Sequence, residues 1–359
     1  MLKIIDKYIL KRYLGTFFTM LLLFIPIGIM ANLSEKVDNM IENKVAFLAI
    51  MGYYGNFTIH MGYLLFPLFL FLSVIWFTSK LANNTEIIAI LSSGISFTRF
   101  LRPYLIGSTF IAVFFFVIGM FVLPDASRKY NDFIYNQLHP GRKARETGEV
   151  FRQLNDNEFI YASSFNSKNQ SAYNFTLEHF EGSRLTHKIS ASKIQFRPKD
   201  SVYRLTNYVL REIGENDDII IKKRRKDTIF NFELAALTPV KYIAETLNYP
   251  DLIKFIEKEK RLGSASVNRY EVVKYKRWSI PFSAFILTII AVAVSAMKRR
   301  GGMGVNLALG IALAFIFVFM DKIFSVMAEQ SGFNPLLAVW LPNIIFGILA
   351  IFLLNRAKR

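Results

Sequence analysis

The stretch YLLFPLFLFLSVIWF, residues 63–77, decides the class of the fold, because it is apolar almost throughout and contains no charged side chain. Extended to about 20 residues, a run of this kind is long enough to cross a lipid bilayer as a helix. The 359-residue chain has further runs of the same character on both sides of it. We predict six membrane spans, at residues 14–33, 58–78, 104–123, 279–297, 304–326 and 336–354.

The composition agrees with a membrane protein. Hydrophobic residues make up 53% of the chain, 35 residues are phenylalanine and none is cysteine, and the apolar residues come in blocks. The first block is too long for a cleaved signal peptide, and no small-residue cleavage site follows it. The sequence therefore predicts an integral membrane protein.

Basic residues near the ends of the spans predict its orientation. They gather before span 1, between spans 2 and 3, between spans 4 and 5, and after span 6, which are all on one side of the membrane. Both termini are therefore expected in the cytoplasm. Much of the net charge of +17 follows from this topology, so it gives no reason to expect a nucleic-acid partner. The basic residues are Lys3, Lys7, Lys11, Arg12, Lys80, Arg99, Arg102, Lys298, Arg299, Arg300, Arg356, Lys358 and Arg359.

A segment of different character, residues 125–277, separates spans 3 and 4 and is expected outside the cytoplasm. Alternating polarity predicts strands in it, and turn-rich pieces between them favour a β-sandwich or jelly roll. A helical linker at residues 239–263 leads to span 4. The expected organisation is spans 1–3 in 1–124, a β domain in 125–277 and spans 4–6 in 278–359. The predicted strands are residues 158–165, 173–180, 184–196, 202–213 and 219–230.

Two interpretations of the β domain remain open. Its inward side chains either fill a closed core or line an open face that holds an acyl chain. Tyr161, Phe175 and Phe196 suit both, because periodicity does not distinguish them.

The motifs of several enzyme classes are missing. The sequence has no P-loop, no nucleophile elbow and no cluster of metal ligands around its four histidines. Acidic residues are nearly absent from the span centres, which argues against an ion-driven carrier. Asp321 and Lys322, near the outer end of span 5, form a snorkelling pair of opposite charges, an interfacial anchor or a contact to a lipid head group.

The half-polar segment NNTEIIAILSSGIS, residues 83–96, lies between spans 2 and 3 and predicts a short cytoplasmic helix. Asn83 is expected to cap it, with Glu86 three residues later closing a capping box and Gly94 ending it. One interpretation is a self-capped interfacial helix. The other is a docking helix for a cytoplasmic partner, in which Glu86 reaches a basic residue and an apolar stripe provides the anchor. The stripe consists of Ile87, Ile90, Leu91 and Ile95.

In this segment and in several others, the chain resembles the LptF/LptG permeases of the bacterial lipopolysaccharide exporter. The stretch LANNTEIIAILSSGIS resembles the coupling helix of that family, and IIDKYILKRYLGTF resembles the opening of its LptG branch. The segment from Asn268 to Phe315, with its Pro-Phe and Arg-Gly motifs, and the final LPN motif are also similar. In contrast, ANLSEKVDN at residues 31–39 has fewer basic residues than LptG relatives often have there.

The resemblance implies six helices with a periplasmic jelly roll after the third, in the cell inner membrane. It implies three kinds of partner: a cytoplasmic LptB-like ATPase dimer that binds ATP and Mg²⁺, a second permease, and LptC/LptA-like periplasmic jelly-roll proteins. This chain itself is expected to be no enzyme and to hold no cofactor or metal.

The same resemblance assigns candidate roles to residues. Glu86, Ile87, Ile90, Leu91 and Gly94 would couple to the ATPase. A lateral gate that admits lipid would use the small residues of span 5, namely Gly304, Ala308 and Gly310. The candidate lipid-binding residues are Lys36, Arg128, Lys129, Asp321, Lys322, Tyr161, Phe175 and Phe196.

Two rival functions are a lipoprotein-releasing permease and a membrane receptor or assembly factor that transports nothing. The first usually has four spans, with its large domain between spans 1 and 2. The second would not need an ATPase at residues 83–96.

Overall fold

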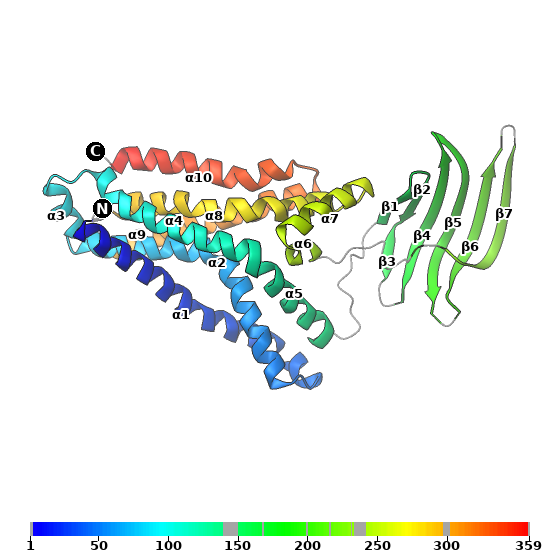
Figure 1. Ribbon diagram of the computed structural model, residues 1–359, viewed down its shortest axis with the longest axis horizontal. Coiled ribbons are helices and arrows are strands. Elements are labelled where there is room, and N and C mark those ends of the chain that lie inside the picture. Colours follow the sequence, from blue (N-terminus) through cyan, green and yellow to red (C-terminus); the bar gives the residue numbers. More distant parts are fainter. Residues whose placement is uncertain are drawn as a thin grey trace. The chain divides into compact units, whose positions relative to one another are not determined.

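The computed structural model describes residues 3–138, 150–166, 169–198, 200–214, 217–230, 232, 242–296 and 302–357. The chain forms two compact units, one of residues 1–130 with 268–359 and one of residues 131–267. The first unit is helical and the second contains a β-sheet (Figure 1). The sequence predicted these boundaries after residues 124 and 277.

The helical unit confirms the six-span prediction. Within the described residues, six helices or continuous runs of helix are long and apolar enough to cross a membrane. The third is a run of four elements, which continues past the end of the unit. The elements are α1 (Ile4–Glu42), α2 (Phe47–Asn83), the short α3 (Glu86–Ser92), α4 (Phe97–Val117), η1 (Ile118–Val122), α5 (Leu123–Phe133), η2 (Ile134–Leu138), α8 (Val267–Ser295), α9 (Gly302–Gln330) and α10 (Pro335–Ala357).

A few polar residues and glycines end and restart the helices. Thr85 has a left-handed backbone, with φ of 60°, and separates α2 from α3. Gly94, with φ of 87°, follows α3, since only glycine adopts this conformation without strain. Ser96 then caps α4, because its hydroxyl accepts a hydrogen bond from the Arg99 amide.

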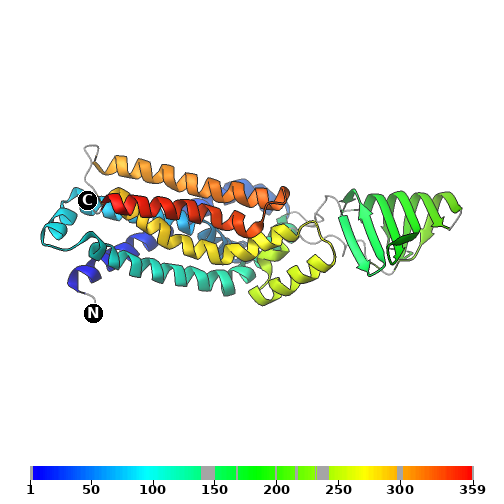
Figure 2. The ribbon, with the colours of Figure 1, turned by 90° about the horizontal axis from the view of Figure 1, so that it is seen from above.

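Helices α2, α4 and α8 supply most of the core of this unit. The rings of Phe66 and Phe115 stack with centroids 4.0 Å apart, and the buried Thr78 hydroxyl donates to Tyr104 at 3.0 Å. Helices α1 and α9 are the least buried of the six. Figure 2 shows α4, α8, α9 and α10 running side by side. The exposed faces of α1 and α9 are therefore available to lipid or to another chain.

The second unit confirms a β domain between the third and fourth spans. It is one antiparallel sheet of seven strands, in the order β1-β2-β4-β5-β6-β7, with β3 paired to β4. The described strands therefore do not divide into the two stacked sheets of a sandwich, and the sequence pattern missed β1. The strands are β1 (Val150–Asn155), β2 (Glu158–Ala162), β3 (Ser164–Asn166), β4 (Ser171–Glu181), β5 (Arg184–Arg197), β6 (Val202–Ile213) and β7 (Asp218–Thr228).

Two helices follow the sheet, α6 (Ile243–Thr246) and α7 (Tyr249–Arg261), where a helical linker was predicted. A buried ion pair, with Arg152 Nη1 2.7 Å from Glu259 Oε2, joins β1 to α7. The Gln153 amide also donates to the Leu262 carbonyl at 3.2 Å. These contacts cover the β1 edge of the sheet.

Candidate functional site

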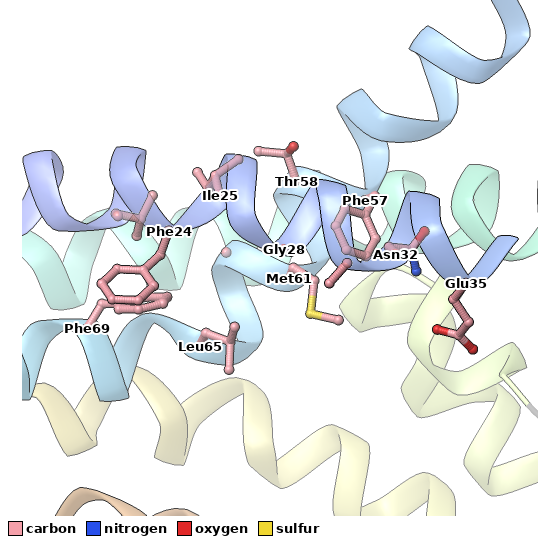
Figure 3. A pocket seen from close by; sticks show the side chains of 13 residues that line it. Phe24, Ile25, Gly28, Asn32, Glu35, Phe57, Thr58, Met61, Leu65 and Phe69 are labelled. Atoms are coloured by element: carbon pink, nitrogen blue, oxygen red, sulfur yellow. The ribbon is translucent and has the colours of Figure 1, made fainter. Parts of the chain in front are cut away.

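An apolar groove lies between α1 and α2. Its volume is about 270 Å³. The rings of Phe24 and Phe69 lie against each other in its wall, with their centroids 4.8 Å apart (Figure 3). Gly28 on α1 and Gly62 on α2 keep it open, since no other atom lies within 4 Å of where their Cβ atoms would be. The groove is lined by Leu21, Phe24, Ile25, Gly28, Ala31, Asn32, Glu35, Phe57, Thr58, Met61, Gly62, Leu65 and Phe69.

A polar network lies beside the end of the groove that carries Asn32 and Glu35. The Lys36 ammonium donates to the Tyr53 hydroxyl at 3.1 Å, and that hydroxyl donates to Asn32 Oδ1 at 2.9 Å. The ammonium also lies over the rings of Tyr53 and Tyr130, at 5.7 and 5.6 Å. Lys36, a predicted lipid contact, therefore helps hold α1 against α2.

The other predicted cations are more accessible. Arg128 Nη2 and Lys129 Nζ lie close to the two carboxylate oxygens of Asp125, at 2.5 and 2.7 Å. Their side chains are 60% and 59% exposed. Two cations share one carboxylate, so this turn of α5 keeps a net positive charge.

Asp321 and Lys322 do not form the pair that their adjacency suggested. Asp321 instead accepts from Lys276 of α8, with Nζ and Oδ2 2.7 Å apart, and Lys322 is exposed. The ion pair thus joins α8 to α9. Lys276, 45 residues away in sequence, could not be found from local spacing.

Helix α3 differs from its prediction in two ways. It covers only Glu86–Ser92, and Glu86 is its first residue rather than the third, so the predicted capping box is wrong. Asn83 instead ends α2. Ile87 is 1% exposed and belongs to the core of its own unit.

The predicted stripe therefore holds α3 to its own chain. Ile90 and Leu91 also pack against that core, and Gly94 ends the helix. The face left open for a partner carries Ile88, which is 54% exposed, with Ala89 and Ser92.

The predicted gate residues of α9 lie on two faces. Gly304 and Ala308 are exposed, in line with Phe315 and Phe319. Gly310 is buried and faces α2: a Cβ built on it would meet the end of the Ile75 side chain. Gly310 therefore serves packing within this chain.

The β-sheet buries one face, and two of the three predicted inward residues lie on it. Phe175 has no exposed surface, and Phe196 packs against the same core. Tyr161 lies on the opposite face, because its neighbours Ile160 and Ala162 point into the core and side chains alternate along a strand.

The chain itself covers this face of the sheet. Phe230 and Phe232, beyond β7, lie against Phe175 with ring centroids 6.2 and 6.4 Å away. The Tyr203 hydroxyl donates to the Phe232 carbonyl at 2.6 Å. The structure thus shows a face filled by the chain's own side chains, as the closed-core interpretation expects, and an acyl-binding face stays a prediction.

The chain matches a family model over residues 7–356, and the model describes the lipopolysaccharide export system permeases LptF and LptG. The match covers all six spans and the β unit. The chain belongs to this family. No curated protein sequence matches it closely enough to serve as a named relative.

Membership makes this LptF/LptG-family chain a multi-pass inner-membrane protein and a transport component rather than an enzyme. The model describes LptF and LptG together, so the LptG branch stays a prediction.

Several residues of this permease-family chain were missed by sequence reasoning. Asn32 and Tyr53 form the network beside the groove, Lys276 pairs with Asp321, and Phe230 and Phe232 cover the sheet. Only the two phenylalanines carry a signal that could have been read, because they alternate with polar residues directly after the last strand.

Proposed function

We propose that this chain is a permease subunit of an ABC transporter that extracts lipopolysaccharide from the inner membrane and passes it to a periplasmic bridge. A separate cytoplasmic ATPase dimer of the LptB type, with ATP and Mg²⁺, supplies the energy. A second LptF/LptG-type permease completes the pathway through the membrane, and LptC/LptA-like proteins form the bridge. Family membership supports this proposal, and so does the lack of a P-loop in the sequence.

The groove between α1 and α2 carries the proposal. It is apolar along most of its length, as an acyl chain requires, and its polar end carries Asn32 and Glu35, beside the contact of Lys36 with Tyr53. Each CH₂ that moves from water into such a groove contributes about 0.8 kcal/mol. One acyl chain therefore has a binding site in this subunit.

The phosphates of the head group require cations. Arg128 and Lys129 are exposed and share a single carboxylate, so either can exchange Asp125 for a phosphate oxygen. Lys36 is a second candidate, because its ammonium contacts Tyr53, which donates to the groove residue Asn32.

The positions of the basic residues support cytoplasmic termini and a periplasmic β unit. In this orientation α3 faces the cytoplasm, and the ATPase docks on its open face at Ile88, Ala89 and Ser92, with Glu86 beside them. The chain has no native cysteine, so single cysteines test the orientation directly. An impermeant maleimide should label Ser192→Cys in spheroplasts and Ser93→Cys only after lysis. The reverse pattern would contradict the orientation.

Six spans also favour this function over a lipoprotein-releasing permease. Such permeases usually insert their large domain after the first of four spans, whereas this chain has its β unit after the third of six.

The groove is tested by filling it. Gly62→Leu adds a side chain to the groove wall, and Gly55→Leu, its matched control on α2, adds one outside the groove; neither glycine has a neighbour within 4 Å of the added Cβ. In vesicles holding the full transporter, we expect Gly62→Leu to lower lipid extraction per ATP about tenfold, equivalent to about 1.4 kcal/mol. Equal extraction by both variants would refute the groove as the acyl site. If the wild-type complex binds neither an ATPase nor lipid, the transport function itself fails and the receptor alternative stands.

A further inference from the structure

The start of α1 is joined to the start of α4 by a partly buried ion pair between Asp6 and Arg99. The Asp6 carboxylate, in a residue that is 4% exposed, accepts from Arg99 Nη2 at 2.6 Å and from the Lys3 amide at 2.8 Å. Arg99 lies in the first turn of α4, just after the segment that leaves α3. The pair therefore joins α1 to the start of α4, directly after the short segment that connects α3 to α4.

A second polar contact joins α1 to α3 itself. The Tyr8 hydroxyl donates to Glu86 Oε2 at 3.1 Å, and the other carboxylate oxygen of Glu86 accepts from Asn84 at 3.2 Å. Glu86 is the first residue of α3. The N-terminal end of α1 and α3 lie at the same end of the helical unit (Figure 1).

Beyond these contacts, α1 is packed along one face for about two and a half turns. Ile9, Tyr13 and Phe17 are buried there, and Gly107 of α4 allows the Tyr13 ring to approach closely. After Phe17, no residue of α1 is buried until Met40. The helix is thus most deeply packed in its N-terminal part, while its later turns line the groove and contact α2 through the network of Asn32, Lys36 and Tyr53.

This arrangement makes α1 a lever. An α-helix rises about 1.5 Å per residue, so α1, with its 39 residues, is about 58 Å long. Pro26 lies between the attached part and the end that carries Asn32 and Glu35, and a proline removes one backbone hydrogen bond and permits a bend. A small rotation at the packed end therefore becomes a larger displacement at the groove once the contacts of Lys36 and Asn32 with Tyr53 are released.

We propose that the contacts Asp6–Arg99 and Tyr8–Glu86 form a latch that carries movement of α3 into α1 and so opens or closes the groove. This inference rests on the proposed function, because it needs an ATPase that moves α3. Asp6 and Arg99 are then positioning residues: they touch neither lipid nor ATPase, and they set the angle of α1. A purely structural ion pair would hold α1 in place without affecting how ATP hydrolysis is coupled to the lipid.

The test separates coupling from stability. The double variant Asp6→Asn/Arg99→Gln removes both charges together, so neither charge is left without its partner. Arg102→Gln is the matched control, because Arg102 is exposed and lies one turn further along α4. Both are measured in the complete transporter in vesicles, for assembly, ATP hydrolysis and lipid extracted per ATP.

We expect the double variant to assemble and hydrolyse ATP while its extraction per ATP falls about tenfold, within the usual range of coupling between two sites. Arg102→Gln should match the wild type. Spin labels on Met30→Cys in α1 and Met51→Cys in α2 should report a distance that changes with ATP in the wild type and in the control, and stays constant in the double variant. Normal coupling and a normal distance change in the double variant would overturn the latch.

A second experiment distinguishes loss of the latch from misfolding of the variant. Asp6→Cys/Arg99→Cys is compared with itself before and after bridging by a short bis-methanethiosulfonate linker, which is possible because the chain has no other cysteine. Extraction per ATP should rise when the bridge forms, and an unchanged value would overturn the latch. If the wild type shows neither extraction nor an ATP-dependent distance change, the proposed function fails instead.

Discussion

At the scale of single residues, a missing side chain determines how closely α1 approaches α4. A Cβ added to Gly107 would lie 2.4 Å from ring atoms of Tyr13. The ring cannot easily move aside, because Tyr13 has no exposed surface and its hydroxyl lies 3.3 Å from Thr288 Oγ1. The attached part of α1 therefore depends on this glycine.

We predict that Gly107→Ala lowers the free energy of unfolding by about 1–3 kcal/mol, the usual effect of overpacking a filled core. Gly15→Ala is the control, because Gly15 lies on α1 with nothing within 4 Å of the added Cβ. Thermal unfolding of the two variants in detergent, followed by intrinsic fluorescence, measures the difference. A melting temperature for Gly107→Ala equal to that of Gly15→Ala would show that the Tyr13 contact is adaptable.

At the scale of elements, the β-sheet offers an apolar face that the chain itself fills. The end of β7 is held by a two-point ion pair between Arg204 and Asp227, with N–O distances of 2.8 and 2.6 Å. The hydrogen bonds from Arg204 hold the pKa of Asp227 below its usual value, so the carboxylate is charged at neutral pH. Phe230 and Phe232 follow directly and lie on the apolar face. Lipid reaches this face only if the two rings leave it.

A photo-crosslinker at Phe196 should therefore capture lipopolysaccharide only while the transporter hydrolyses ATP. The same crosslinker at Tyr161, on the opposite face of the sheet, should capture none. Adding Phe232→Ala should raise the yield at Phe196 without ATP, because one of the covering rings is removed. Equal yields at Phe196 and Tyr161 would contradict a lipid track on this face.

At the scale of the whole molecule, the exposed faces of α1 and α9 are the candidate surfaces for the second permease of the proposed transporter. Gly304, Ala308 and Phe315 lie along one face of α9, and small residues let membrane helices approach closely. Gly310 lies on the other face, against Ile75. Ala308 and Gly310 therefore serve as the test position and its control, one on each face of α9.

We predict that Ala308→Cys forms a disulfide with a cysteine placed in span 1 of the second permease and that Gly310→Cys does not. Oxidation, which forms the disulfide at Ala308→Cys, should stop lipid extraction, and reduction of the disulfide should restore it. Crosslinking followed by gel electrophoresis, together with the extraction assay, measures both effects. Full transport with the crosslink complete would exclude a gate at this face.

Much of the fold followed from local pattern. Long apolar runs predicted the six spans, since a helix in a bilayer must satisfy its backbone within itself. Alternating polarity placed β4, β5 and β6 nearly to the residue. The pattern did not predict a single sheet, because a sandwich and a single sheet with one covered face use the same alternation of side chains.

The sequence by itself determined the class of the protein, its organisation into spans and an inserted β unit, and its family, because these depend on composition and on motifs in chain order. Only the tertiary structure decided which apolar face meets which partner. Ile87 was expected to dock a partner and is buried in its own core, and Asp6 finds Arg99, 93 residues away. The physical reason is that an apolar stripe must be buried and a charge must be paired, whereas the packing of the whole chain decides which residues bury the stripe or pair with the charge.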